Sequence, residues 1–149
     1  MFIQISITKK LKFKLKMLSL LRMHHIAIIC SDYHKSKSFY TEVLGFSIVN
    51  EIYRSERDSY KLDLSLNGTY IIELFSFPSP PQRLTQPEAN GLRHLAFNVL
   101  DINNEVETLR RFNIPFEPLR FDKITRKHFT FFKDPNFEVI FFRNSLLDT

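Results

Sequence analysis

The sequence predicts an α+β domain made of two similar modules, each with the order strand, helix, strand, strand, strand. Three observations lead to this prediction. The 149 residues suit one domain, and 44% hydrophobic with 25% charged residues is an ordinary globular composition. A set of residues in the first half also recurs at a constant offset in the second half. An internal repeat of this kind indicates two copies of one supersecondary unit.

The first module is predicted over residues 23–76. Ser31 and Asp32 are N-cap candidates for a helix that ends at Gly45, a typical C-terminal stop. Asn67-Gly68 favours a type I′ hairpin turn between the last two strands. The strands are expected over residues 24–30, 46–54, 59–66 and 69–76.

A proline-rich connection, residues 77–90, separates this module from a second one over residues 91–143. Asp101 is the N-cap candidate for a helix that ends near Asn113, and a turn is expected at 134–136. The strands of this module are expected over residues 92–99, 115–121, 128–133 and 137–143.

The repeat is clearest where each module begins. His25, Ala27 and Asp32 correspond to His94, Ala96 and Asp101 at an offset of 69 residues. The two halves therefore place a histidine and a helix cap at the same points of their strand-helix units. Together they form a single domain over residues 23–145.

The positive charge is concentrated in residues 1–22, which carry six basic residues and no acidic one. Removing these six from 21 basic residues leaves 15 against 16 acidic residues, so the domain is close to neutral and nucleic-acid binding is not expected. We interpret residues 1–22 as a basic extension, partly ordered or upstream of a start at Met17 or Met23. The alternating Lys and apolar residues of 10–16 also allow an amphipathic strand on a membrane or polyanion.

One cysteine, Cys30, excludes an intramolecular disulfide and favours a reducing, cytoplasmic location, where we expect a buried core thiol. No apolar run approaches the roughly 18 residues of a transmembrane helix.

Three residues stand in positions that are unusual for their chemistry. His25 and His94 occupy equivalent places in two apolar strands, and Glu73 lies inside a third. An ionised carboxylate in a buried strand is costly unless it is paired or bound to a metal. Two imidazoles and one carboxylate suit a divalent transition metal such as Zn, Ni, Mn or Fe. Symmetric packing of the modules would let both histidines converge on Glu73.

Several segments resemble the vicinal-oxygen-chelate superfamily, which includes glyoxalase I, bleomycin-resistance proteins and extradiol dioxygenases. The resemblance is to its small bacterial single-chain glyoxalase-like members. It implies paired βαβββ modules in a curved, mixed eight-stranded sheet, metal ligands at His25, Glu73 and His94, and pairing of copies as a homodimer. The segments that carry it are Phe39–Phe46, Glu73–Pro78 and Gly91–Phe97.

The resemblance also implies a second glutamate on the last strand, where this sequence differs. Counting from the turn at 134–136 places Phe141 at the ligand position, and an offset of 68 residues carries Glu73 to Phe141 as well. Glu138 is three residues earlier and faces the other way unless a bulge shifts the register.

We therefore expect a metal-dependent, glyoxalase I-like lyase or isomerase whose small substrate chelates the metal through neighbouring oxygens. Glu73 is the candidate general base. Arg57, Lys127 and Phe141 are candidate substrate contacts. The alternative is a protein with reduced catalysis that sequesters a small apolar or aromatic ligand, which Phe141 favours. A non-haem metal dioxygenase is the third hypothesis.

Overall fold

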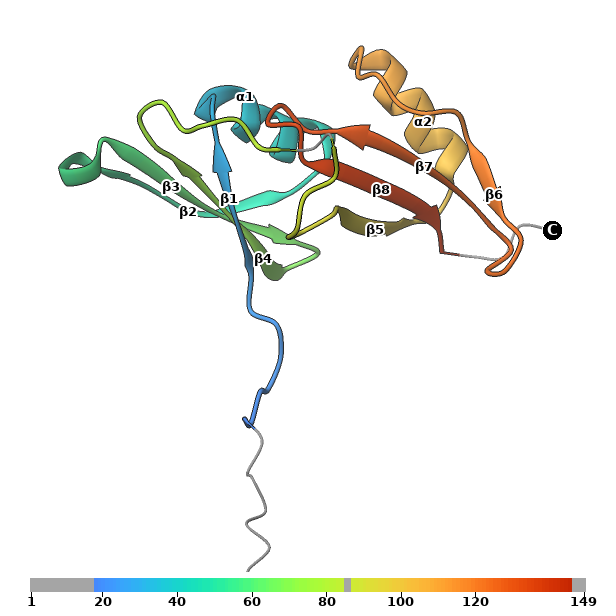
Figure 1. Ribbon diagram of the computed structural model, residues 1–149, viewed down its shortest axis with the longest axis horizontal. Helices are drawn as coiled ribbons and strands as arrows, with labels where there is room; N and C mark the ends of the chain where they lie inside the picture. Colours follow the sequence, from blue (N-terminus) through green and yellow to red (C-terminus); the bar gives the residue numbers. More distant parts are fainter. Residues whose placement is uncertain (1–17, 85–86, 146–149) are drawn as a thin grey trace, which may run out of the picture.

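The computed structural model describes residues 18–84 and 87–145 and contains the two predicted modules (Figure 1). In the first module, α1 continues without a break into a π-helical turn, η1, and a short 3-10 turn, η2, joins β2 to β3. The elements of this module are β1 (Ile26–Cys30), α1 (Tyr33–Ser38), η1 (Phe39–Val43), β2 (Ser47–Arg54), η2 (Ser55–Arg57), β3 (Ser59–Leu66) and β4 (Thr69–Ser76).

The second module repeats the order of the first. Its elements are β5 (Leu95–Val99), α2 (Ile102–Arg111), β6 (Arg120–Asp122), β7 (Lys127–Lys133) and β8 (Val139–Asn144). Hydrogen bonding divides the eight strands into two four-stranded mixed sheets, with the orders β1-β4-β3-β2 and β5-β8-β7-β6. In each sheet the first strand runs parallel to the last strand of its module, and the other pairs are antiparallel. The predicted α+β fold with paired βαβββ modules is confirmed.

Both predicted helix caps are formed. The Asp32 carboxylate accepts a hydrogen bond from the Lys35 backbone N–H at 3.1 Å, and the Asp101 carboxylate accepts one from Asn103 at 2.9 Å. Asn67 and Gly68 both have positive φ angles, as a type I′ turn requires. Local chemistry thus sets where helices and turns begin.

One predicted strand is much shorter than expected. The segment 115–121 contributes only β6 and an isolated bridge between Phe116 and Phe132. Pro115 and Pro118 remove backbone donors from this segment, which explains why it cannot form a longer ladder.

The core lies between each sheet and its helix. Tyr40, Leu62 and Leu74 are fully buried in the first module, and Leu109 and Ile140 are buried equivalently in the second. Both helices lie on the same side of the sheets in Figure 1, so none of the described residues forms a helix over the opposite face of either sheet. We call these surfaces the open faces of the first and second sheets.

The turn between β7 and β8 packs against α1 and η1 and holds the two modules together through hydrogen bonds. The Tyr40 hydroxyl donates to Asp134 Oδ2 at 3.1 Å, and Asn136 Nδ2 donates to Ser36 Oγ at 2.9 Å. The backbone N–H of Ser31 donates to Asn136 Oδ1 at 2.9 Å. The first of these bonds is buried, the second half-buried and the third exposed, and together they hold the second module against the helical side of the first.

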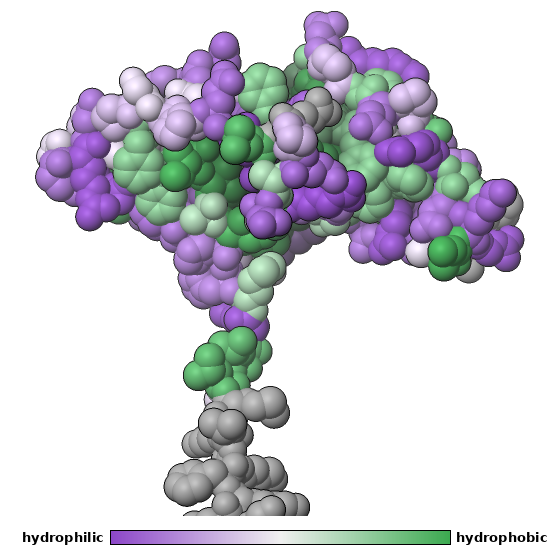
Figure 2. Space-filling view, viewed as in Figure 1, coloured by the Kyte–Doolittle hydropathy of each residue, from purple (hydrophilic) through white to green (hydrophobic). Residues whose placement is uncertain are grey.

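Residues 1–17 of the predicted basic extension lie outside the described residues, while 18–22 lead away from the body of the molecule (Figure 1). Figure 2 shows hydrophobic side chains on this segment, where Leu18 and Leu21 are 87% and 99% exposed. No helix in residues 18–84 or 87–145 is long and apolar enough to cross a membrane.

Candidate functional site

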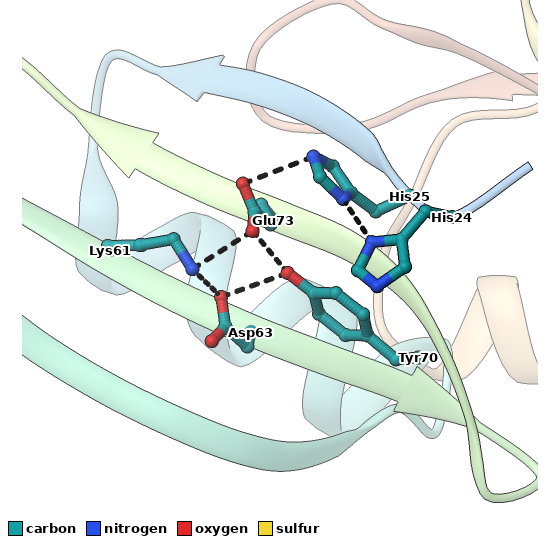
Figure 3. A network of polar contacts seen from close by, with 6 residues as sticks. All are labelled: His24, His25, Lys61, Asp63, Tyr70 and Glu73. Atoms are coloured by element: carbon teal, nitrogen blue, oxygen red, sulfur yellow. Dashed lines mark hydrogen bonds and ion pairs between the residues drawn. The ribbon is translucent and has the colours of Figure 1, made fainter.

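His25 and Glu73 meet on the open face of the first sheet. β1 and β4 are adjacent parallel strands in which Ala27 pairs with Glu73, so the side chain of His25 extends from the same face. His25 Nε2 lies 3.3 Å from Glu73 Oε2, and the Glu73 side chain is only 12% exposed (Figure 3). The structure therefore brings together two of the three residues that the sequence singled out.

Three further side chains surround Glu73. Lys61 Nζ lies 2.9 Å from Glu73 Oε1, and the hydroxyl of Tyr70 donates a hydrogen bond to the same oxygen. Tyr70 also contacts Asp63 Oδ1 at 3.2 Å, and Lys61 forms an ion pair with Asp63 (Figure 3). Glu73 thus belongs to a network with one cation, two carboxylates and a bridging phenol.

A β-bulge creates this network. Tyr70 pairs with Ser65 while Ile72 pairs with Leu64, so Ile71 is the extra residue in β4. An unbroken hairpin from Asn67-Gly68 would place Leu62 opposite Glu73, whereas the bulge places Asp63 there. Sequence alternation missed Lys61, Asp63 and Tyr70 for this reason, and no signal in the hairpin marks the bulge.

The network keeps Glu73 ionised. Burial raises the pKa of the Glu73 carboxyl, but hydrogen bonds from Tyr70 and Lys61 outweigh burial and hold that pKa below its ordinary value. Burial lowers the pKa of the Lys61 ammonium, but Asp63 and Glu73 more than compensate and leave it raised. Burial and the bond to Glu73 raise the pKa of the Tyr70 phenol. Near neutral pH the site therefore holds carboxylate, ammonium and neutral phenol.

His24 orients the imidazole of His25. Their Nδ1 atoms are 2.7 Å apart, and His24 also packs edge-on against the Tyr70 ring, with 5.1 Å between ring centroids. If His25 Nε2 donates to Glu73, its Nδ1 accepts from His24. His24, which lies next to the predicted ligand, is thus part of the site's support.

His94 lies in the second module, directly before β5. Its ring centroid is 5.7 Å from that of Phe131 and 5.5 Å from that of Phe141, and its Nδ1 is buried without a hydrogen-bond partner. Among the described residues, no group of three or more His, Cys, Asp or Glu side chains is placed to hold a metal ion. Within one chain, His25 therefore pairs with Glu73, whereas His94 lies at the start of the second sheet.

Phe141 occupies in the second sheet the place that Glu73 occupies in the first. Ala96 pairs with Phe141 as Ala27 pairs with Glu73. Glu138 precedes β8, and its Oε2 lies 2.8 Å from Arg83 Nη1. The pairing of β8 with β5 and β7 continues without a register shift.

The two other predicted substrate contacts lie elsewhere. Arg57 is exposed in the turn between β2 and β3, and Lys127 Nζ donates to the backbone carbonyl of Ser145 at 2.7 Å. Cys30 is buried, as expected for a core thiol, and its Sγ contacts the carbonyl of Phe75 at 3.3 Å.

Comparison with known proteins identifies the class to which this fold and site belong. The family model of the Glyoxalase/Bleomycin resistance protein/Dioxygenase superfamily matches residues 22–140. The chain belongs to this superfamily.

Close relatives cover most of the chain. YwkD of Bacillus subtilis is 62% identical over 114 residues, which are 76% of this chain and 89% of YwkD. YaeR of Escherichia coli is 57% identical over 120 residues, 80% of this chain and 93% of YaeR. A glyoxalase family protein from Enterococcus faecalis superposes with a TM-score of 0.75 at 42% identity, over 82% of this chain and 96% of that chain.

The superfamily includes enzymes of different activity. Glyoxalase I of Leishmania major is 26% identical to this chain with a TM-score of 0.65, over 84% of this chain and 87% of that chain. The fosfomycin resistance protein FosX of Listeria monocytogenes, solved with Mn(II), shares the fold at 15% identity and a TM-score of 0.65, over 83% of this chain and 92% of that chain. A 2-epi-5-epi-valiolone epimerase from Actinomyces is 29% identical over 104 residues, 59% of this chain and 57% of that protein. Membership therefore defines a fold and a family of chemistries, and the activity of this chain has to be argued from its own residues.

Proposed function

We propose that this protein is a metal-dependent enzyme with glyoxalase I-like lyase or isomerase activity on a small substrate with neighbouring oxygens. The observation that carries the proposal is the pair of His25 and Glu73 on adjacent strands, 3.3 Å apart, with Glu73 held ionised by Lys61 and Tyr70. A half-buried carboxylate with this much support is typical of a functional site. We also propose a cytoplasmic location, which the free thiol of Cys30 favours.

The donor set fits a divalent metal such as Zn, Ni, Mn or Fe if two copies share the site. His25 and Glu73 supply two ligands from one copy, and His94 of the partner subunit supplies a third. The buried, unpartnered Nδ1 of His94 supports a missing interaction there, and the open faces of the two sheets are free of covering helices. A homodimer that faces the first sheet of one copy toward the second sheet of the other would unite these donors.

Each polar residue has a distinct task in this proposal. The bound metal would polarise the substrate oxygens as a Lewis acid. Glu73 takes a proton from the carbon that bears one of these oxygens and returns it to the adjacent carbon that bears the other, so the substrate is isomerised with no net gain or loss of protons. Lys61 and Tyr70 orient the Glu73 carboxylate and stabilise its charged form.

A second candidate function is sequestration of a small apolar ligand without chemistry. The observation that favours it is the ring cluster of Phe129, Phe131 and Phe141 on the second sheet, with centroids 4.9–5.9 Å apart. Such a surface binds apolar groups with or without a metal.

The first test is metal binding and its sharing between copies. We expect protein purified without chelators to bind Zn, Ni or Mn in calorimetric titrations, and Glu73→Ala and His94→Ala each to weaken binding at least a hundredfold. His34→Ala, on α1 away from Glu73, is the control histidine and should change little. Retention of full affinity in Glu73→Ala would refute the proposed site.

Mixing two inactive variants separates a shared site from a site within one chain. A His25→Ala and His94→Ala mixture forms heterodimers with one intact and one doubly substituted site. We expect the mixture to recover metal binding and the metal-dependent isomerisation of a dicarbonyl-thiol adduct. No recovery, with both variants folded and dimeric, would contradict the shared site. Metal binding without turnover of any vicinal dicarbonyl substrate would favour sequestration.

A further inference from the structure

We propose that the open face of the second sheet binds the organic part of the substrate, and that this part is an aromatic carboxylate. The inference rests on the proposed function in placing this pocket beside His94, and it adds the substrate class. The observations behind it are a cavity, a rigid aromatic floor and a rim with an unneutralised cation.

The cavity has a volume of about 830 Å³ and lies along β7, beside the segment 115–117. Its lining includes His94, Phe116, Phe131 and Val139, with Arg120 and Lys133 among the charged residues. A volume of roughly 300–1,000 Å³ is usual for sites that enclose small organic molecules. The cavity is therefore large enough for a single-ring compound with a polar substituent.

Its floor is aromatic and held in place. Phe131 packs against Phe129 and Phe141, with ring centroids 5.9 and 4.9 Å away, and His94 approaches it edge-on at 5.7 Å. Rings fixed by such neighbours lose little further freedom when a ligand ring stacks on them. The Arg120 guanidinium also lies over the Phe131 ring, 5.1 Å from its centroid, so a ligand ring would stack against this pair of guanidinium and ring. An aromatic body in the ligand would use this floor better than a flexible aliphatic chain.

The rim carries three cations, of which two are already paired. Arg93 Nε lies 2.9 Å from Glu88, and Arg120 Nη2 lies 2.7 Å from Glu117. Lys133 is exposed, with its Nζ 5.9 Å from the centroid of the Phe137 ring, and it forms no ion pair with any residue that the structure describes.

Asp134 is the remaining acid in the lining. Its carboxylate already accepts hydrogen bonds from Tyr40 at 3.1 Å and from the backbone N–H groups of Asn136 and Glu138, each at 2.8 Å. Lys133 is thus the cation of the pocket that no carboxylate of the described residues neutralises. An ammonium on an aromatic-floored pocket selects a ligand that joins a ring to a carboxylate.

The test uses metal-free protein and a matched ligand series, with affinities measured by ligand-observed NMR and calorimetry. We expect phenylacetate to bind saturably, and phenylacetamide and acetate to bind at least tenfold more weakly. Lys133→Gln should remove most of the preference for phenylacetate over phenylacetamide. Phe131→Leu should weaken both ring compounds three- to tenfold. Lys123→Gln and Phe121→Leu, exposed outside this cavity, are the matched controls.

Equal affinity for phenylacetate and phenylacetamide, or an unchanged preference in Lys133→Gln, would overturn the proposal. A metal arm separates its failure from that of the proposed function. Phenylglyoxylate, which adds neighbouring oxygens, should bind at least tenfold more tightly when Zn, Ni or Mn is present. If phenylacetate binds as expected but metal does not change the affinity for phenylglyoxylate, the proposed aromatic carboxylate pocket is supported and the proposed metal-dependent function is refuted. If the protein binds metal but phenylacetate does not bind saturably, the proposed metal site is supported and the proposed pocket is refuted.

Discussion

The two modules share a backbone arrangement but carry opposite chemistry on their open faces. Asp63 lies opposite Glu73 in the first sheet, and Phe131 lies opposite Phe141 in the second. The same offset relates Lys61 to Phe129, so three charged side chains correspond to three phenylalanines. The strand register that places a carboxylate in one module places a ring in the other. A repeated fold can thus carry polar side chains on one copy and apolar side chains at the equivalent strand positions of the other.

The modules also differ where a bulge is present in one and absent in the other. The bulge at Ile71 brings Tyr70 to the Glu73 carboxylate. Glu138 is the counterpart of Tyr70 by the same offset, and it is buried beside Arg83 instead. The first module thus gains a hydrogen bond to Glu73 at a position where the second module forms an ion pair with the connection between the modules.

The largest expected effect comes from making the second module resemble the first. Phe141→Glu places a carboxylate beside His94, Phe129 and Phe131. Without metal this should cost about 3 kcal/mol of unfolding free energy, because ring contacts are lost and a charge enters a half-buried apolar surface. With metal the new oxygen donor should restore stability by mass action, so Zn, Ni or Mn should raise the melting temperature more in the variant than in the parent.

Phe129→Glu is the matched control, because it places the same charge on the neighbouring strand of the same face. It should be destabilised similarly and gain nothing extra from metal. Equal metal-dependent shifts in Phe141→Glu and the parent would show that the counterpart of Glu73 does not face a metal site.

The Glu138 position should give a smaller, pH-dependent effect. Burial raises the pKa of the Glu138 carboxyl, Arg83 lowers it and Asp134 raises it, so the pKa of the folded state lies above its ordinary value. The folded protein therefore binds this proton more tightly than the unfolded chain does. The resulting stability is present below the unfolded pKa and is lost as the pH rises through the folded pKa.

Urea denaturation between pH 4 and pH 7 measures this contribution. The stability of the parent should fall relative to Glu138→Gln as the pH rises. Arg83→Met should steepen the fall and cost about 1–3 kcal/mol at pH 7, because it leaves a buried carboxylate unpaired. Glu117→Gln, at an exposed ion pair, should change little with pH. A parent that gains stability relative to Glu138→Gln with rising pH would contradict the assigned direction.

The sequence predicted those features that depend on local chemistry and on the repeat. Asp32 and Asp101 cap helices because carboxylates accept bonds from free helical N–H groups. The repeat predicted that Phe141 is the counterpart of Glu73, and the structure pairs these residues equivalently with Ala96 and Ala27.

The features that the sequence did not predict depend on irregularities in the strands, which the alternation of apolar and polar residues does not reveal. A single extra residue at Ile71 exchanges Leu62 for Asp63 opposite Glu73, and with it the neighbours of the carboxylate. His25 and Glu73 could be paired by face and strand order, but the position of His94 depends on how whole modules are arranged, which strand patterns do not specify.

The hairpin turns give a prediction of about 1 kcal/mol. The first-module turn uses Gly68 at φ 76°, whereas the second-module turn has Phe137 at φ 66°, where a side chain is strained. Phe137→Gly should relieve that strain, offset in part by greater freedom of the unfolded chain. We expect stability to rise by up to about 1 kcal/mol in urea denaturation. A loss of stability would show that ring contacts of Phe137 outweigh its backbone strain, and Phe137→Ala separates these two effects.

The smallest effect is expected from the segments that lead into β1 and β5. The connection into β5 is fastened, since Arg83 pairs with the buried Glu138. Residues 18–22, the described part of the segment to be deleted, form no such ion pair, and Leu18, Leu20 and Leu21 are 87%, 85% and 99% exposed. Exposed residues contribute little to unfolding free energy, and lysines crowded in residues 9–16 repel one another.

Deleting residues 1–22 should therefore shift the melting temperature by no more than about 2 °C, a change below roughly 0.5 kcal/mol for a domain of this size. Arg83→Met is the comparison, because it loosens the other segment at its anchor and should lower the melting temperature clearly more. Calorimetry of the three proteins at one concentration decides the matter. A loss above about 5 °C on deletion, more than 1 kcal/mol, would show that residues 1–22 pack on the domain or between its copies.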